Sequence, residues 1–180
     1  MSTRYAALLR GINVGGKNML PMKELAAMFA AAGCTDVRTY IQSGNVVFHA
    51  PRQIAETVPA RVTEQIEAQF GLRIPVVMRS REEMARVATS NPFLISGAAA
   101  QSLHVYFLKD RPTPHAVAGL DPERSAPDLF TVSGSEIYAL LPNGSARTKL
   151  TNAYFDAKLG TVSTVRNWNT VLKLHAMLQG

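Results

Sequence analysis

The chain has little cysteine and no long apolar segment, and each of these two shortages excludes a class of protein. Cys34 is the only cysteine among 180 residues, so neither an intrachain disulfide nor a cysteine-rich zinc site can form. A signal peptide needs about 7–15 apolar residues behind a basic start, and a membrane span needs about 20. The N-terminal stretch before Arg10 holds only a few. We therefore expect a cytoplasmic protein with no membrane partner.

The composition is that of a folded globular protein. Hydrophobic residues make up 47% of the chain and charged residues 18%, which is too apolar for a disordered chain. Glycine and proline show no linker-like concentration. The length allows one large domain or two small ones.

The excess of positive charge, +6 in total, is confined to two segments. Residues 1–52 hold six basic and two acidic side chains, a net +4, and residues 147–175 hold five basic and one acidic, again +4. The rest of the chain must therefore carry −2. Such charge can serve solubility alone, or it can form one face that attracts an anion.

Hydrophobic periodicity in the first half predicts the order βαββαβ. The expected elements are a strand over 5–12, a helix from Pro21 to Gly33, a hairpin of strands 37–42 and 46–49, a helix from Pro59 to Gly71, and a strand over 73–79. This order is typical of a ferredoxin-like unit, whose sheet runs 4-1-3-2. Pro75 cannot donate to a ladder, which suits the edge position of the fourth strand.

A capping box at Ser80 and Glu83 predicts the start of a helix between the two halves. The second half then predicts the same order of elements as the first. The expected elements are a strand over 103–109, a short helix within 112–120, a hairpin of strands 129–133 and 137–141, a helix over 149–159, a strand over 161–165, and a last helix with Trp168, Val171, Leu172 and Leu178 on its apolar face. Only the order of elements repeats, because no residue-level repeat is visible. We predict an α+β fold of two ferredoxin-like βαββαβ units, a tandem duplication packed together, with a C-terminal helix. The expected domains are 1–90 and 91–180, the second including that helix.

A glycine-rich loop, GINVGGKN at 11–18, follows the first strand and nearly matches the phosphate-binding pattern GxxxxGK[ST]. Asn18 replaces the hydroxyl that would bind magnesium, and Pro21 starts the helix too late to direct its N-terminus at a phosphate beside Lys17. Three interpretations are open: a nucleoside-triphosphatase loop, a backbone anion site assisted by Lys17, or glycines that only shape a tight βα turn.

Two further polar motifs also have structural and functional interpretations. Gln42–Asn45 forms a hairpin tip whose side chains can satisfy turn amides, and a binding role requires this tip to approach Gly15 and Gly16. At 166–173, helical spacing places Arg166, Asn169 or Thr170, and Lys173 on one polar stripe that faces either a ligand or solvent. Trp168 beside them is either a core anchor or a stacking platform.

No catalytic or metal constellation is visible. The four histidines lack metal-ligand spacing, and no nucleophile–base pair can be assembled. Cys34 follows the C-terminal end of a helix, where the dipole does not stabilise a thiolate. The central strands offer Phe48 but no RNP signature, which disfavours the usual RNA-recognition mode. We expect no metal and no cofactor, and whether the protein is an enzyme stays open.

Four motifs together are familiar: RGINVGGKN at 10–18, TYIQSGNVVF at 39–48, NPF at 91–93 and TVRNWNT at 164–170. In this order they resemble a bacterial family catalogued as a domain of unknown function, number sixteen-ninety-seven, over nearly the whole chain. The resemblance implies an α+β structure with duplicated ferredoxin-like units. It implies no activity, substrate or catalytic residue.

The leading hypothesis is an anionic partner, either a nucleotide or a nucleic acid, held in a basic cleft where the loop at 10–18 meets residues 166–173. The alternatives are an enzyme that acts on a phosphorylated small molecule, and an interaction or scaffold protein with no ligand. The oligomeric state is left open. The predicted ligand-binding residues are Arg10, Asn13, Gly15, Gly16, Lys17, Asn18, Ser43, Asn45, Arg166, Asn167 and Asn169.

Overall fold

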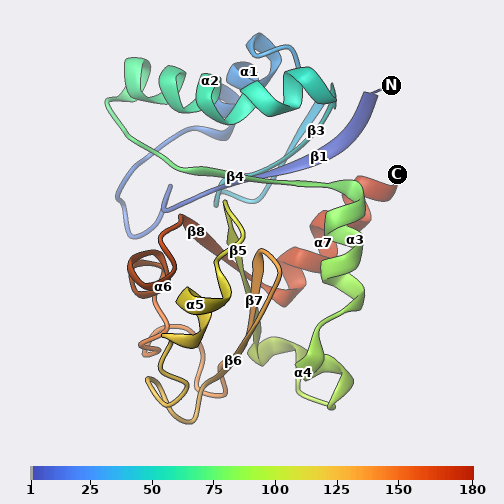
Figure 1. The fold of residues 1–180 in the computed structure, drawn as a ribbon. Coiled ribbons are helices and arrows are strands. Elements are labelled where there is room, and N and C mark those ends of the chain that lie inside the picture. The colour runs from blue at the N-terminus through green and yellow to red at the C-terminus, as the bar shows by residue number, and fades with distance from the viewer. Residues whose placement is uncertain (1) are drawn as a thin grey trace. The chain divides into compact units, whose positions relative to one another are not determined.

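The computed structural model describes residues 2–180 and divides into two compact units, each built around a four-stranded antiparallel sheet (Figure 1). Unit 1 comprises the chain up to Ala85 together with Leu174–Gly180, and unit 2 comprises Arg86–Lys173. The predicted domains, 1–90 and 91–180, differ from these units at the junction and in the last helix. The division into domains stays a prediction.

Unit 1 follows the predicted βαββαβ order. Its elements are β1 Ser2–Leu9, α1 Met22–Ala31, β2 Thr35–Tyr40, β3 Asn45–Pro51, α2 Arg52–Phe70 and β4 Val76–Ser80. The sheet runs β2-β3-β1-β4, with every neighbour antiparallel, so the predicted strand order is confirmed and β4 is an edge strand. The strand expected over 73–79 begins only at Val76, so Pro75 lies just outside it.

The two helices of unit 1 lie on one face of its sheet and close the core there (Figure 1). Alternate residues of β1 and β3, such as Leu9 and Phe48, point to this face because strand side chains alternate. The Phe48 ring stands 5.2 Å from the ring of Phe29 on α1 and 5.8 Å from the ring of Tyr5. Burial of this aromatic cluster fixes the register of the sheet.

The prediction that α2 begins at Pro59 is wrong. The helix begins at Arg52, directly after the extended residue Pro51, and Pro59 lies inside it. Proline inside a helix removes one backbone hydrogen bond. The apolar stripe Ala55, Val58, Val62, Ile66 packs on the core along the whole helix, and this burial outweighs the lost bond. The predicted end at Gly71 is confirmed, since its φ is 65°.

The predicted capping box opens α3 Arg81–Thr89. The amide of Glu83 donates to Ser80 Oγ at 3.2 Å, and the amide of Ser80 donates to Glu83 Oε2 at 2.7 Å. A four-residue helix that the sequence did not indicate follows, α4 Pro92–Ile95. Asn91 caps it by accepting from the amide of Phe93 at 3.1 Å.

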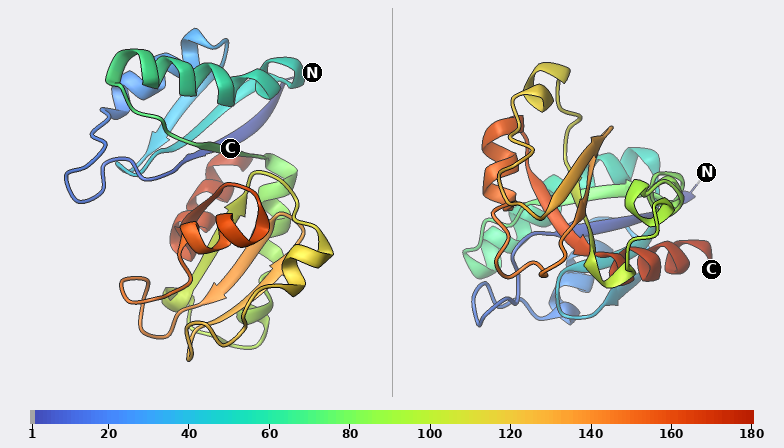
Figure 2. Two further views of the ribbon diagram at one scale, coloured as in Figure 1. Left: turned by 60° about the vertical axis from the view of Figure 1, so that its left-hand side comes forward. Right: turned by 90° about the horizontal axis from the view of Figure 1, so that it is seen from below.

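Unit 2 repeats the architecture of unit 1. After the short 3-10 helix η1 Ala100–Ser102, its elements are β5 Leu103–Leu108, α5 Pro114–Ala118, β6 Leu129–Ser133, β7 Glu136–Leu140, α6 Asn152–Leu159 and β8 Ser163–Asn167. The last helix, α7 Trp168–Gln179, begins in unit 2 and ends in unit 1. The sheet runs β6-β7-β5-β8, the order of unit 1. Both α5 and α6 lie beside one face of it (Figure 2). The α+β fold of two ferredoxin-like units with a C-terminal helix is therefore confirmed.

The repeat extends to individual backbone hydrogen bonds. At the end of β1, the amide of Leu9 donates to Gly44 O at 2.8 Å, and at the end of β5 the amide of Leu108 donates to Ser135 O at 2.8 Å. The amide of the following residue also has an equivalent acceptor in each unit, one residue before the fourth strand of the sheet. Arg10 donates to Pro75 O, and Lys109 donates to Val162 O. The first loop of each unit therefore starts from the same framework.

One helix boundary and one side-chain placement in the last part of the chain differ from expectation. The helix expected from Lys149 begins at Asn152, because Thr151 accepts from the amide of Tyr154 and caps it there. On α7, Leu174 is buried while Leu172 is 42% exposed, so Leu172 was wrongly placed on the apolar face. The residues Trp168, Val171, Leu174 and Leu178 instead form one stripe.

Among residues 2–180, no helix is both long and apolar enough to span a membrane.

Candidate functional site

Two loops of unit 1 lie together, and we call residues 10–20 with 41–45 the two-loop cluster. Asn13 Nδ2 donates to Gln42 O at 2.8 Å, and the amide of Leu9 donates to Gly44 O. The hairpin tip therefore approaches the glycine-rich loop, and it does so at the base of that loop.

The asparagines of the loop shape its backbone. Asn13 Oδ1 accepts from the amide of Leu20 at 2.7 Å, and Asn13 Nδ2 donates to Leu20 O at 2.9 Å. Asn18 Nδ2 donates to Gly11 O at 2.9 Å. Both asparagines have positive φ, 53° and 49°, which this residue type tolerates better than most. The side chains of both asparagines therefore hydrogen-bond to the backbone of the loop and stabilise its conformation.

The tip of the loop is a tight turn from Val14 to Lys17. The amide of Lys17 donates to Val14 O at 3.0 Å, while Gly15 and Gly16 have φ of 57° and 73°. Two consecutive positive φ values define a type I′ turn. The helix starts only at Met22, so the interpretation as a nucleoside-triphosphatase loop is wrong. Within residues 2–180, the amides of Gly15 and Gly16 have no acceptor.

Unit 2 makes the equivalent connection with a much shorter loop. There the chain passes from Lys109 to Thr113, which caps α5 by accepting from the amide of Ala116. Since the short loop suffices to join strand and helix, the longer excursion at 10–21 is not needed for the connection. Extended loops on a rigid framework are frequent sites of binding.

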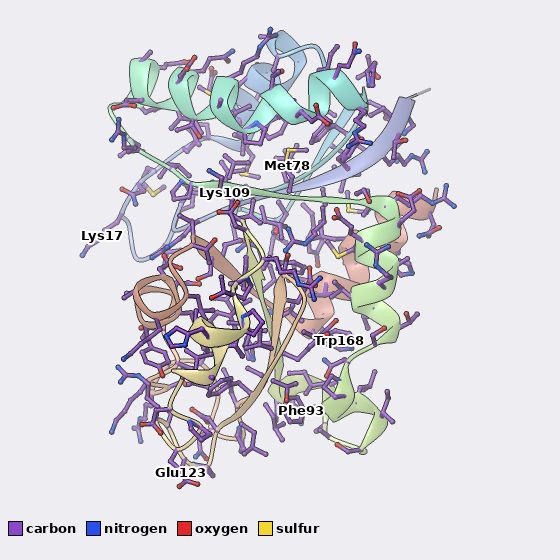
Figure 3. The ribbon with its side chains drawn as sticks, viewed as in Figure 1. Lys17, Met78, Phe93, Lys109, Glu123 and Trp168 are labelled. Atoms are coloured by element: carbon purple, nitrogen blue, oxygen red, sulfur yellow. The ribbon has the colours of Figure 1, made fainter. Side chains whose placement is uncertain are left out.

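The surface of the two-loop cluster combines a positive charge with exposed apolar side chains. Lys17 extends away from the ribbon and has no ion-pair partner within residues 2–180 (Figure 3). Val14, Met19 and Ile41 are 62%, 61% and 52% exposed. Ile41 also has φ of 50°, which is strained for a β-branched residue and is found mostly at functional positions.

Ser43 and Asn45 support the hairpin tip. Asn45 is buried, and its Nδ2 donates to Tyr40 O at 3.2 Å and to Ser43 Oγ at 3.0 Å. The turn-stabilising interpretation of these two side chains agrees with this geometry. Arg10, in contrast, is half-buried at the start of the loop.

The predicted polar stripe on the last helix is wrong, because Arg166 belongs to β8 and precedes the helix. Arg166 is buried, and its Nη1 donates to Thr164 Oγ1 at 2.9 Å and to Val165 O at 2.8 Å. Burial lowers the pKa of this guanidinium to about 10. Asn167 accepts from the amide of Thr170 at 2.9 Å and starts α7, and Asn169 is exposed. A site shared by these residues and the two-loop cluster stays a prediction.

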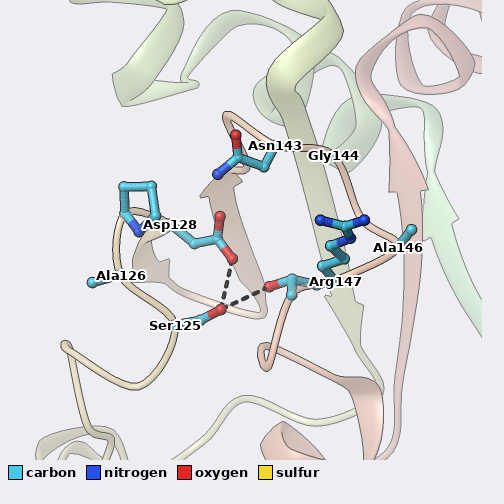
Figure 4. Close-up of a pocket in the computed structure, with 9 residues that line it drawn as sticks. Ser125, Ala126, Asp128, Asn143, Gly144, Ala146 and Arg147 are labelled. Carbon is cyan, nitrogen blue, oxygen red and sulfur yellow. Dashed lines mark hydrogen bonds between the residues drawn. The ribbon is translucent and has the colours of Figure 1, made fainter.

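A pocket in unit 2 escaped the sequence analysis. It has a volume of about 390 Å³, and its polar walls are Ser125, Asp128, Asn143, Arg147 and Thr148 (Figure 4). These residues come from two loops that are distant in sequence. No motif with fixed spacing connects them, so only the folded chain reveals the pocket.

Cys34 is buried in the core of unit 1, and burial raises the pKa of its thiol to about 11. At pH 8 only about one thiol in a thousand would then be a thiolate. We expect native protein to resist iodoacetamide at this pH while urea-unfolded protein is alkylated quickly, with mass spectrometry as the measurement. Rapid alkylation of the folded protein would contradict the burial.

Between residues 2 and 180, no three His, Cys, Asp or Glu side chains form a group that could hold a metal ion.

Comparisons with known proteins agree with the fold. A conserved bacterial protein of Streptococcus pneumoniae, whose structure is solved, aligns with a TM-score of 0.68 and 24% identity over 99% of both chains. A search of curated proteins finds no match. Residues 2–138 match the family model described as "Protein of unknown function (DUF1697)". The chain belongs to this family, whose function is unknown.

Proposed function

We propose that the two-loop cluster binds a phosphate-bearing ligand, a nucleotide or a nucleic acid. The observation that carries the proposal is the tip of the turn. There the amides of Gly15 and Gly16 have no acceptor within residues 2–180, and the ammonium of Lys17 has no ion-pair partner among them. Adjacent backbone amides beside a cation are a common phosphate site, since charge-assisted hydrogen bonds are about twice as strong as neutral ones.

The exposed apolar side chains favour a ligand larger than inorganic phosphate. Val14 flanks the turn directly, and Met19 and Ile41 are exposed in the same cluster. A nucleotide offers an anionic end for Lys17 and an apolar base face for these side chains. Arg10 adds positive charge at the start of the loop. No ring of the kind that nucleic-acid modules use for stacking is fully exposed here, so phosphate contacts must supply much of the affinity.

The predicted site residues of unit 2 are treated apart from the two-loop cluster. Arg166, Asn167 and Asn169 were predicted to complete the site, and this remains to be tested. The buried guanidinium of Arg166 is already engaged with Thr164 and Val165, which favours a supporting role for it. The two-loop cluster is proposed to bind its ligand without them.

Substitution of Lys17 by alanine is expected to weaken binding of a fluorescein-labelled single-stranded oligonucleotide about tenfold, or about 1.4 kcal/mol. Fluorescence anisotropy across a salt series measures this, with nucleotides as competitors. The logarithm of the affinity should fall with the logarithm of the salt concentration by about 0.7 for each neutralised phosphate. Lys17→Ala should reduce that slope by about 0.7, the contribution of one phosphate contact.

The matched control is Lys158→Ala, which removes the same charge from an exposed position on α6. We expect it to leave the affinity unchanged. Equal losses in both variants would mean that net charge alone attracts the oligonucleotide. A flat salt response would reject nucleic acid as the partner, and binding that ignores Lys17 altogether would reject the site.

A further inference from the structure

The pocket of unit 2 has walls that are held in place by hydrogen bonds. Ser125 Oγ accepts from the amide of Lys149 at 2.9 Å and lies 3.4 Å from Thr148 Oγ1. Next to it, Arg124 Nε donates to Lys149 O at 3.0 Å, and the Arg124 guanidinium lies over the Tyr154 ring, 4.0 Å from its centroid. The loop that carries Asp128 is therefore fastened to the loop that carries Thr148, so the pocket exists before any ligand arrives.

Asp128 has one carboxylate oxygen that no described residue engages. It is 6% exposed and lines the pocket. Its Oδ2 accepts from Ser125 Oγ at 2.7 Å, while its Oδ1 accepts no hydrogen bond and the group forms no ion pair with residues 2–180. Oδ1 is not among the fully buried atoms without a partner, so it is accessible from the pocket. It can therefore accept a hydrogen bond from a ligand there, and a cationic donor suits its charge best.

Ser125 holds this carboxylate in place and is poorly suited to be a nucleophile. Its hydroxyl hydrogen is directed to Asp128, and its oxygen already accepts from the amide of Lys149. No histidine lines the pocket to remove a proton from it. The geometry therefore fits binding better than covalent chemistry.

Arg147 brings the opposite charge to the same pocket. Its guanidinium has no hydrogen-bond or ion-pair partner within residues 2–180, and it does not pair with Asp128. Figure 4 shows the two side chains on different walls. A purely cationic ligand would be repelled by Arg147, and a purely anionic ligand would be repelled by Asp128.

We propose that this pocket binds a small zwitterion of the amino-acid class, whose ammonium contacts Asp128 and whose carboxylate contacts Arg147. A volume of about 390 Å³ is at the small end of ligand pockets and leaves ample room for such a compound. The amide of Asn143 supplies a further polar contact at the rim. This site is independent of the two-loop cluster and does not require a phosphate.

Saturation-transfer NMR on the full chain tests the proposal. Glycine, β-alanine and γ-aminobutyrate are the zwitterionic probes, because the separation between ammonium and carboxylate increases from the first to the third. Methylammonium and acetate serve as single-charge probes, and glucose as a neutral one. We expect one or more of the zwitterions to bind with millimolar or better affinity and the other probes to show little binding. Arg147→Gln should weaken that binding about tenfold or more.

Arg111→Gln is the matched control, because Arg111 is an exposed arginine of unit 2 outside the pocket. It should leave binding unchanged, whereas Asp128→Asn should abolish it. Arg147 is exposed, so its substitution keeps the test valid even if Asp128→Asn fails to fold. The proposal is overturned if no zwitterion binds, if methylammonium, acetate or glucose binds as well, or if Arg147→Gln behaves like Arg111→Gln.

Discussion

Substitution of Trp168 by alanine is expected to lower the free energy of unfolding by about 3–5 kcal/mol. Trp168 is the first residue of α7 and the largest fully buried side chain, 1% exposed. Its removal forfeits the burial of the indole and leaves a cavity that the surrounding residues can fill only in part. Such a loss is a large fraction of the stability of an ordinary domain, about 5–15 kcal/mol.

Urea denaturation followed by circular dichroism is the appropriate measurement, because Trp168 is the only tryptophan and its substitution removes the fluorescence signal. Leu172→Ala, on the exposed side of the same helix, is the control and should change stability by less than about 0.5 kcal/mol. A change below about 1 kcal/mol for Trp168→Ala would mean that the indole is not a core anchor. It would then return to consideration as a platform for a ligand.

Gly44→Ala is expected to destabilise the protein by about 2–4 kcal/mol. Gly44 has φ of 77°, and a Cβ built there would lie 2.8 Å from Leu9 Cβ and 3.0 Å from Ile12 Cδ1. Two costs combine, since alanine is strained at positive φ and the added methyl group displaces buried side chains. Thermal unfolding followed by circular dichroism measures the loss.

Gly15→Ala separates the two costs. Its φ of 57° is in the same region, but a Cβ there would meet nothing within 4 Å. We expect it to cost only the backbone term, about 1–2 kcal/mol. If both variants lost the same stability, the close approach of the hairpin tip to Leu9 and Ile12 would be wrong, and with it the joining of the two loops.

The sequence predicted the architecture chiefly through the order of its elements. The βαββαβ order put the fourth strand at an edge of the sheet, where β4 lies, whereas Pro75 lies just before that strand and not within it. Pro59 shows where a local rule fails, because the apolar stripe of α2 continues past it. Elsewhere a helix begins at its capping residue and not where the hydrophobic period begins. Thr151, for example, starts α6 later than the period predicted.

The site was predicted less completely, and for physical reasons. The tight turn at Gly15 and Gly16 could be predicted because turn chemistry is local. The burial of Arg166 could not, since its place on β8 depends on the register Val105↔Arg166 with β5. The matching register Ala6↔Arg79 in unit 1 shows that the two buried arginines hold equivalent positions. Their neighbours differ enough that no sequence repeat is visible. Asp128 and Arg147 line one pocket only because two loops of unit 2 fold together.

The backbone bonds at the end of β1 have a consequence for how recognition can change within this architecture. Gly44 and Pro75 hold Leu9 and Arg10 at the root of the loop, and unit 2 keeps the same anchoring with a far shorter connection. The length and chemistry of the segment beyond that root are therefore uncoupled from the sheet. New binding preferences can arise there by insertion, deletion or exchange of residues while the scaffold beneath is left unaltered.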